Sequence, residues 1–279
     1  MSASGAGPIL LVGAGRMGGA LLKGWLARGI APERIFIQEP SPPPDVAELI
    51  KSSGIAEGTP PAMPSAPAII VLAVKPQVMD SVLPGIAPLA GADTVVLSIA
   101  AGRTVASIAS HFPVGTPIVR AMPNTPAAIG RGISALYDNY AVKPEQKVLC
   151  EDLLAAAGET VWVQGEAFMD AVTAVSGSGP AYVFLLAECL TEAGVAAGLP
   201  PELAAQLARA TVSGAGELLR QSDLDPAELR RNVTSPAGTT AAALRVLMGE
   251  EGAGDGGPMA DLLREAVAAA TRRSRELAS

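Results

Sequence analysis

The feature that most constrains the fold is a glycine-rich stretch, GAGRMG, at residues 13–18. It follows the apolar run ILLV and opens a segment of helical pattern, MGGALLKGWLARG. In such a context the first glycine makes a tight turn, the second admits a pyrophosphate to the backbone, and the third lets the helix pack on the strand. The stretch therefore predicts a dinucleotide site, with a loop formed by Gly13, Ala14, Gly15, Arg16, Met17 and Gly18.

The runs that follow extend this loop into an α/β domain. Short β-branched runs alternate with helical or turn segments up to about residue 165, and this alternation is typical of a parallel sheet. We therefore expect residues 1–165 to form a Rossmann-type dinucleotide-binding domain. The expected strands are ILLVGA, RIFIQE, AIIVLAV, TVVLSIA, PIVRAM, ISALY and TVWVQ, with TPPAMPSAP (residues 59–67) as a surface loop before the third.

The second half of the chain has a different pattern. From residue 166 onward, long Ala- and Leu-rich stretches are separated by proline turns, so we expect residues 166–279 to be all-α. Between Pro180 and Leu199 the charged residues are Glu188 and Glu192 alone, which leaves that helix without a polar face. A domain of roughly 110 residues buries few such helices by itself. The pattern predicts a homo-oligomer, at least a homodimer, built through the C-terminal helices.

Composition excludes several classes of protein. With 49% hydrophobic and 17% charged residues the chain is globular, and a net charge of −7 without any basic run argues against a nucleic-acid partner. The glutamates of its most apolar stretch argue against a membrane span. The N-terminus MSASGAGPILLVGAG has no basic leader region. Cys150 and Cys189 show no metal spacing, so we expect reduced thiols, no metal site and a cytoplasmic protein.

The end of the second expected strand, IFIQEPSP, bears on the cofactor. Glu39 lies about 20 residues past the glycines, where an acid accepts hydrogen bonds from the ribose hydroxyls and repels a 2′-phosphate, which favours NAD. Ser41 could instead donate to a 2′-phosphate, with help from Arg16 or Arg34. NADH and NADPH both stay open here, as does the alternative that Glu39 is a solvated strand end.

A third candidate contact follows the third expected strand, in VLAVKPQ. Lys75 and Pro76 leave the carboxyl end of that strand, which is the edge where parallel sheets bind ligands. We expect Lys75 to contact the cofactor, although a plain surface charge is the alternative.

The residues available for acid–base chemistry limit the reaction. A nicotinamide enzyme that oxidises a hydroxyl group needs a general base, commonly histidine or lysine. The one histidine, His111, lies in a turn with the sequence HFPVG, and we expect it to be structural. None of the lysines lies in the helical half. Reduction of a cyclic imine demands less, because the imine arrives protonated and a threonine hydroxyl suffices to bind its nitrogen. The lysines are Lys23, Lys51, Lys75, Lys143 and Lys147.

The stretch VTSPAGTTAAALRVLM, residues 233–248, supplies such a threonine. We expect Ser235 to be the N-cap of a helix and Pro236 its first residue. Free amides at a helix N-terminus bind a carboxylate, so an imine that carries a carboxylate would fit, although a cap without a ligand is the alternative. The amides expected to be free belong to Ala237, Gly238, Thr239 and Thr240.

Several of these motifs resemble one known family. The stretches ILLVGAGRMGGAL, LAVKPQ, AMPNTPAAIGRG, AVSGSGPAYVF and NVTSPAGTTAAAL resemble pyrroline-5-carboxylate reductase, over residues 8 to 277. The resemblance implies a dinucleotide-binding domain followed by a helical domain that interleaves between two subunits, with decamers in some members. It also implies reduction of 1-pyrroline-5-carboxylate to L-proline, the last step of proline biosynthesis, with NADPH or NADH.

The resemblance also implies roles for particular residues. Thr240 matches the catalytic threonine whose hydroxyl approaches the imine nitrogen, and the amides of Thr239 and Thr240 match those that hold the carboxylate. The remaining substrate-binding residues are Ser235, Ala237 and Gly238. The matched cofactor-binding residues are those of the 13–18 loop, Ser41, Ala73, Val74, Lys75, Pro76, Ile99, Ala100, Ala101, Met122, Pro123, Asn124 and Asn232. Glu39 joins them on the strand-end argument given above and not through the resemblance.

The chain departs from the family pattern in three places. Ala237 stands where the motif SPGG carries its first glycine, and TPPAMPSAP lacks an asparagine that commonly contacts the cofactor phosphate. Glu39 occupies a strand end where many relatives are uncharged. Both cofactor-side departures weaken the case for NADPH.

Two other functions remain open from the sequence. One is a reductase or dehydrogenase of similar build that acts on another small acid. The other is a noncatalytic protein that binds NAD(P) and regulates a partner.

Overall fold

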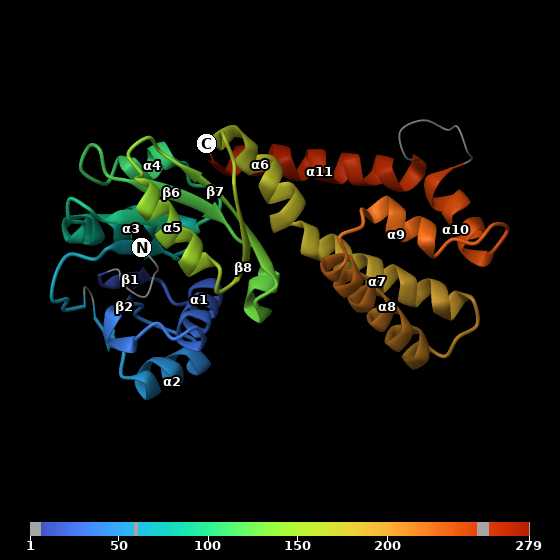
Figure 1. The fold of residues 1–279 in the computed structure, drawn as a ribbon, viewed down its shortest axis with the longest axis horizontal. Helices are drawn as coiled ribbons and strands as arrows, with labels where there is room; N and C mark the ends of the chain where they lie inside the picture. The colour runs from blue at the N-terminus through green and yellow to red at the C-terminus, as the bar shows by residue number, and fades with distance from the viewer. Residues whose placement is uncertain (1–6, 59–60, 250–256, 279) are drawn as a thin grey trace. The chain divides into compact units, whose positions relative to one another are not determined.

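The computed structural model describes residues 7–58, 61–249 and 257–278. The chain forms two compact units, residues 1–177 with 271–279, and residues 178–270 (Figure 1). The sequence division at residue 165 lies earlier, because residues beyond it bond to the sheet unit through Glu166 and Ser176. Residues 1–6, where a leader was considered, and residues 59–60 of the expected loop lie outside the described residues.

The first unit contains a mixed sheet with the strand order β3-β2-β1-β4-β5-β6-β7-β8. The strands from β1 to β6 run parallel, as predicted, whereas β7 pairs antiparallel to β6 and β8 runs parallel to β7. An all-parallel sheet is therefore wrong at this end. Only the short 3₁₀ turn Thr125–Ile129 links β6 to β7, and a parallel return needs a crossover of about a dozen residues or more.

All seven predicted strands form, and the short β3 is added to them. The strands are β1 (Ile9–Val12), β2 (Ile35–Gln38), β3 (Ala56–Glu57), β4 (Ile69–Leu72), β5 (Val95–Ser98), β6 (Ile118–Met122), β7 (Gly132–Asp138) and β8 (Gly158–Trp162).

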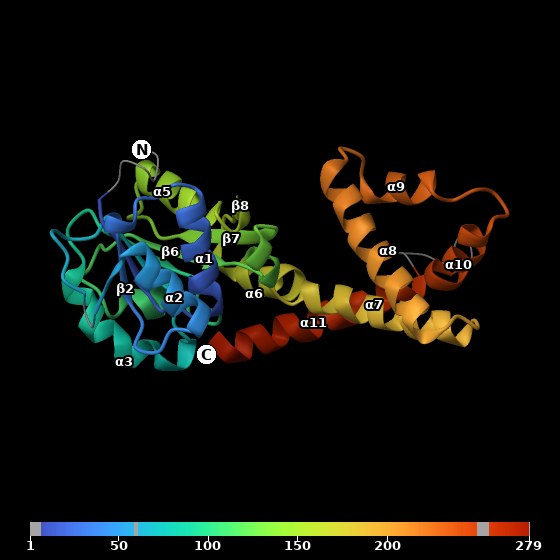
Figure 2. The same cartoon turned by 90° about the horizontal axis from the view of Figure 1, so that it is seen from below.

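Helices cover both faces of this sheet (Figure 2). Side chains of α1, α2 and α5 form the core on one face, and those of α3 and α4 form the core on the other. Trp25 of α1 is fully buried, and its indole N–H donates to Leu153 O at 2.9 Å, which fastens α1 to α5. Burial on both faces explains why β1 and β4 are continuous apolar runs. The helices are α1 (Arg16–Ala27), α2 (Pro44–Ser53), α3 (Pro76–Ile86), α4 (Val105–Ala109), α5 (Pro144–Leu154) and α6 (Met169–Val172).

The second unit is helical, as predicted. Its helices α7 and α8 pack against each other, and Ala204 approaches Gly194 so closely that a Cβ there would lie 3.2 Å from the alanine methyl. Within the described ranges, no helix is both long and apolar enough to cross a membrane. The helices are α7 (Gly179–Ala196), α8 (Pro201–Gln221), α9 (Pro226–Asn232), α10 (Thr239–Met248) and α11 (Gly257–Ala278), of which α11 ends in the first unit.

Candidate active site

The glycine loop between β1 and α1 has the geometry that a pyrophosphate needs. Gly13 has a φ of +94°, and a Cβ at this position would lie 2.8 Å from the backbone of Ala73. A Cβ on Gly18 would overlap the carbonyl oxygen of Gly13. A Cβ on Gly15 would meet nothing within 4 Å, so this face of the loop is open. The three glycines thus occupy the three positions that the motif requires.

The start of α1 provides donors for an anion beside that open face. Gly15 is the N-cap, and the first helical hydrogen bond runs from Gly19 N to Gly15 O at 2.7 Å. The amides of Arg16, Met17 and Gly18 precede this bond, and the first turn contains no acidic residue to compete for them. The residues present therefore fit a dinucleotide phosphate.

The other predicted cofactor residues of this unit follow the carboxyl ends of parallel strands. Hydrogen bonds continue the ladder past the strand ends, from Gly13 N to Gln38 O at 2.9 Å and from Ala73 N to Val12 O at 2.7 Å. The loops consequently begin side by side at one edge of the sheet. The residues at this edge are Glu39, Ser41, Ala73, Val74, Lys75, Pro76, Ile99, Ala100, Ala101, Met122, Pro123 and Asn124.

Glu39 is held in place by two backbone amides. Its Oε2 accepts a hydrogen bond from Ala14 N and its Oε1 accepts one from Ser41 N, each at 3.0 Å. The half-buried carboxylate thus bridges the glycine loop and the loop after β2, so it is no free strand end. Arg34, considered as a phosphate ligand, instead donates to Gly7 O at 3.1 Å.

Lys75 and Asn124, two further predicted cofactor residues, differ in whether their side chains already bind other parts of the chain. Lys75 is exposed at the N-cap of α3, where it is available to a ligand. The Asn124 side chain accepts from Ile133 N at 2.9 Å and donates to Ser176 O at 3.1 Å. Its amide therefore fixes the turn after β6, and the sequence contained no signal for this structural use.

His111 belongs to a surface ion cluster. Its Nε2 lies 3.0 Å from Asp80 Oδ1, and the Arg103 guanidinium pairs with the same carboxylate. The hydrogen bonds from Arg103 and, to a smaller extent, His111 hold the pKa of the exposed Asp80 carboxyl below its ordinary value. This pairing agrees with the prediction that His111 is structural.

The head of α10, in the second unit, differs from the prediction. The helix begins at Thr239 with Gly238 as its N-cap, so Ser235 and Pro236 are neither the cap nor the first residue. Residues 235–238 form a turn instead, closed by a hydrogen bond from Gly238 N to Ser235 O at 3.1 Å. Ala237 has a φ of +57°, a left-handed conformation that a helix cannot continue. Proline second and a positive φ third are the pattern of a type II turn.

This shift changes which amides are available to a ligand. The Gly238 amide is used in the turn, so the expectation that it is free is wrong. The first helical hydrogen bond runs from Ala242 N to Gly238 O at 3.1 Å, which leaves the amides of Thr239, Thr240 and Ala241 as the donors of the first turn. Ala241 was missed because the helix was expected to begin three residues earlier.

The strained alanine leads to a stability prediction. We expect Ala237→Gly to raise the free energy of unfolding by about 0.5 to 1 kcal/mol, because relief of the left-handed strain outweighs the added entropy of the unfolded chain. Urea unfolding of both proteins measures this change. As a matched control, Ala243→Gly on an exposed position of α10 should lower stability by about 0.5 to 1 kcal/mol. A loss of stability in both variants would contradict the strain argument.

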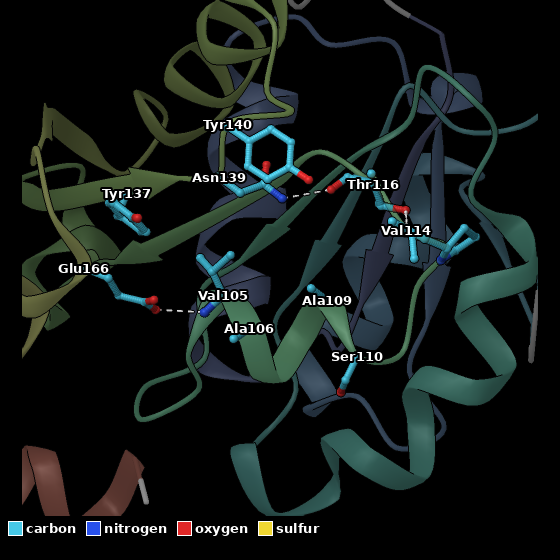
Figure 3. A pocket seen from close by; sticks show the side chains of 12 residues that line it. Val105, Ala106, Ala109, Ser110, Val114, Thr116, Tyr137, Asn139, Tyr140 and Glu166 are labelled. Carbon is cyan, nitrogen blue, oxygen red and sulfur yellow. Dashed lines mark hydrogen bonds between the residues drawn. The ribbon is translucent and has the colours of Figure 1, made fainter.

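The first unit also contains a cavity of about 510 Å³ (Figure 3). It lies between α4, the loop before β6 and the end of β7. Several of its polar groups are already paired with the chain: Glu166 accepts from Val105 N at 2.8 Å, and Asn139 donates to Thr116 O at 3.0 Å. Glu166 also pairs with the buried Arg120 at 2.9 Å, a contact that no sequence pattern indicated. Because none of the predicted residues lines it, the cavity is not the candidate active site.

The described residues contain no group of three or more His, Cys, Asp and Glu side chains placed to hold a metal ion. The predicted site residues lie in two places, each described by itself: the sheet edge in the first unit and the region before and at the head of α10 in the second.

Comparisons with known proteins connect these two parts to one family. Residues 166–277 match the family model described as pyrroline-5-carboxylate reductase dimerisation, and residues 8–102 match one described as NADP oxidoreductase coenzyme F420-dependent. The pyrroline-5-carboxylate reductase of Pseudomonas aeruginosa is 39% identical over 275 residues, covering 97% of this chain and 96% of that protein. That of Synechocystis is 41% identical, covering 96% of this chain and 97% of that protein.

Solved structures agree with these sequence matches. A pyrroline-5-carboxylate reductase from Coxiella burnetii has a TM-score of 0.87 and 33% identity, covering 98% of this chain and 99% of that chain. The Plasmodium falciparum pyrroline carboxylate reductase, solved with NADP bound, has a TM-score of 0.77 and 30% identity, with 99% of each chain covered. The resemblance seen in the sequence is confirmed: the chain belongs to the pyrroline-5-carboxylate reductase family of NAD(P)-dependent oxidoreductases.

Proposed function

We propose that this chain reduces 1-pyrroline-5-carboxylate to L-proline, the last step of proline biosynthesis. The head of α10 carries the proposal, because three amides and the hydroxyl of Thr240 belong to one helical turn. That combination suits a small ring with a carboxylate on one side and a nitrogen on the other. In this proposal the helical half binds substrate and the sheet half binds cofactor.

On the cofactor side, the chain positions NADPH or NADH, which supplies the hydride that reaches the imine carbon. The amides of Arg16, Met17 and Gly18 hold the pyrophosphate, supported by the open face at Gly15. Glu39 binds at the adenosine ribose, and the loops after β4, β5 and β6 border the rest of the cofactor. We assign Asn232, which ends α9, to the nicotinamide end.

On the substrate side, the carboxylate accepts hydrogen bonds from the amides of Thr239, Thr240 and Ala241. The Thr240 hydroxyl accepts a hydrogen bond from the protonated ring nitrogen and so fixes which face of the imine is presented. The nitrogen keeps its proton as the imine carbon gains the hydride, and the product is the secondary amine. Catalysis consists mainly of positioning and charge stabilisation, so no histidine or lysine base is required.

Helix α7 supports assembly through the helical half. It buries none of its residues, and six of its large apolar side chains are at least 40% exposed. A second copy of the chain would remove this surface from water, in agreement with the dimerisation model that residues 166–277 match. These side chains are Val183, Phe184, Leu185, Leu186, Leu190 and Val195. Light scattering after size exclusion measures the mass: we expect at least twice that of one chain, and ten times that mass would indicate a decamer.

We place the protein in the cytoplasm. Cys150 and Cys189 are both free thiols, which is the ordinary state of cysteine in a reducing compartment.

The reaction is tested by oxidation of NADH and NADPH by the purified protein with 1-pyrroline-5-carboxylate, followed by absorbance and by detection of proline. Oxidation with either cofactor and formation of proline are expected. Tight cofactor binding without reduction of this imine would overturn the proposal. Activity on a hydroxy acid at high pH would then favour a dehydrogenase, and binding without any turnover would favour a nucleotide sensor.

A further inference from the structure

We propose that Glu39, together with the proline-rich loop that follows it, makes this chain select NADH over NADPH. The inference rests on the proposed use of a nicotinamide cofactor and deepens it by assigning the choice between the two. The argument begins with the donors that the loop after β2 can offer.

The loop after β2 has almost no backbone donors for a phosphate. Residues 40–44 read PSPPP, and proline has no backbone N–H. Ser41 alone has an amide, and that amide donates to Glu39 Oε1 at 3.0 Å. A 2′-phosphate entering here could bind the Ser41 hydroxyl. The one backbone donor of residues 40–44 would not be available to it, because that amide already binds a carboxylate.

Glu39 is positioned to accept from a ribose instead. Its other oxygen binds Ala14 N at 3.0 Å, which ties the carboxylate to the loop that receives the pyrophosphate. A carboxylate has about four lone-pair sites, so two remain after these two bonds. They suit the two hydroxyls of an unmodified ribose, as an acid at this place in the fold does.

Charge favours the same cofactor. A 2′-phosphate carries up to two negative charges near neutral pH, and beside Glu39 it would be repelled unless cations offset it. Two basic side chains, Lys23 of α1 and Arg34 just before β2, are engaged elsewhere. Lys23 pairs with Asp45 at 2.6 Å, and Arg34 donates to Gly7 O. Arg16, exposed on the glycine loop, is the charge that opposes this preference. An exposed arginine and the Ser41 hydroxyl would attract the phosphate, but the fixed carboxylate and the lack of a free backbone donor in residues 40–44 leave NADH favoured.

Binding measurements without substrate test the inference. Calorimetric titration of the purified protein with NAD⁺ and NADP⁺ should show tighter binding of NAD⁺, on the order of tenfold. Glu39→Gln, which keeps the shape but removes the charge, should reduce that ratio, and Glu39→Ser should reduce it further by strengthening NADP⁺ and weakening NAD⁺. Glu33→Gln is the matched control, because Glu33 is an exposed acid just before β2, at the opposite end of the strand, and it should leave the ratio unchanged.

A second pair of ligands keeps the test independent of how well the variants fold. On the unaltered protein, adenosine 2′-phosphate should compete with NAD⁺ less well than adenosine itself, since only the phosphate differs. Equal or tighter binding of NADP⁺ by the unaltered protein would overturn the inference, as would an NAD⁺/NADP⁺ ratio that neither Glu39 variant changes. Failure to reduce 1-pyrroline-5-carboxylate with the NAD⁺ preference intact would refute the proposed reaction and leave the selectivity standing.

Discussion

Replacement of Thr240 by alanine is expected to lower turnover of 1-pyrroline-5-carboxylate ten- to a thousandfold. That range corresponds to an increase in the activation barrier of roughly 1.4 to 4 kcal/mol. The substitution removes the hydroxyl that orients the ring nitrogen but keeps the amide, so the carboxylate can still bind. We therefore expect kcat to fall more than KM rises. Steady-state kinetics with saturating cofactor measures both quantities.

Two neighbouring variants separate this role from a structural one. Thr240→Ser retains a hydroxyl and should recover most of the activity. Thr239→Ala is the matched control, because Thr239 is exposed in the same turn and contributes only its amide in this proposal, so its kcat should change by less than about threefold. Equal losses in Thr239→Ala and Thr240→Ala would point to damage at the helix start and reject the assigned role.

The sequence predicts the features of this fold that depend on neighbouring residues better than those that depend on residues far apart in the chain. The strands and the glycine loop were predicted because their signals are local: alternating apolar runs, and glycines beside a strand and a helix. The direction of β7 depends on the connection from β6, which is too short for a crossover. The residues of the strand itself, ISALY, do not indicate that direction. The ion pair of Arg120 with Glu166 joins residues 46 positions apart and has no sequence signature.

The start of α10 shows a different limit. Ser-Pro is a common helix start, so capping preference alone predicts a helix from Pro236. A left-handed alanine is unfavourable in isolation, and propensity rules therefore do not predict one at Ala237. The turn that forces this conformation also moves the free amides onto Thr239, Thr240 and Ala241. The assignment of these residues to the substrate stays a prediction, and its basis is now a helix that begins at Thr239 instead of Pro236.

Substitutions in the glycine loop should have the second large effect, on stability at one glycine and on cofactor binding at another. Neighbouring backbone constrains Gly18, whereas the approach of the cofactor constrains Gly15. In Gly18→Ala the new methyl meets the carbonyl oxygen of Gly13 and lies 3.2 Å from the Ala73 methyl. Backbone has to move, so we expect the free energy of unfolding to fall by about 3 kcal/mol. In Gly15→Ala the methyl meets nothing within 4 Å, and the N-cap φ of −69° suits alanine, so stability should change by less than about 1 kcal/mol.

For cofactor binding we expect the opposite order: Gly15→Ala should lose more NAD⁺ affinity than the folded fraction of Gly18→Ala. The methyl of Gly15→Ala stands on the open face where the backbone must approach the pyrophosphate, so NAD⁺ affinity should fall at least tenfold, about 1.4 kcal/mol, in a protein that unfolds almost as the unaltered one does. Urea unfolding and calorimetric titration on the same samples compare the two quantities. Undiminished NAD⁺ binding by folded Gly15→Ala would mean that the pyrophosphate does not lie over this loop. Because Gly18→Ala acts through the fold and Gly15→Ala through the ligand, the pair separates the glycine that shapes the loop from the glycine that receives the cofactor.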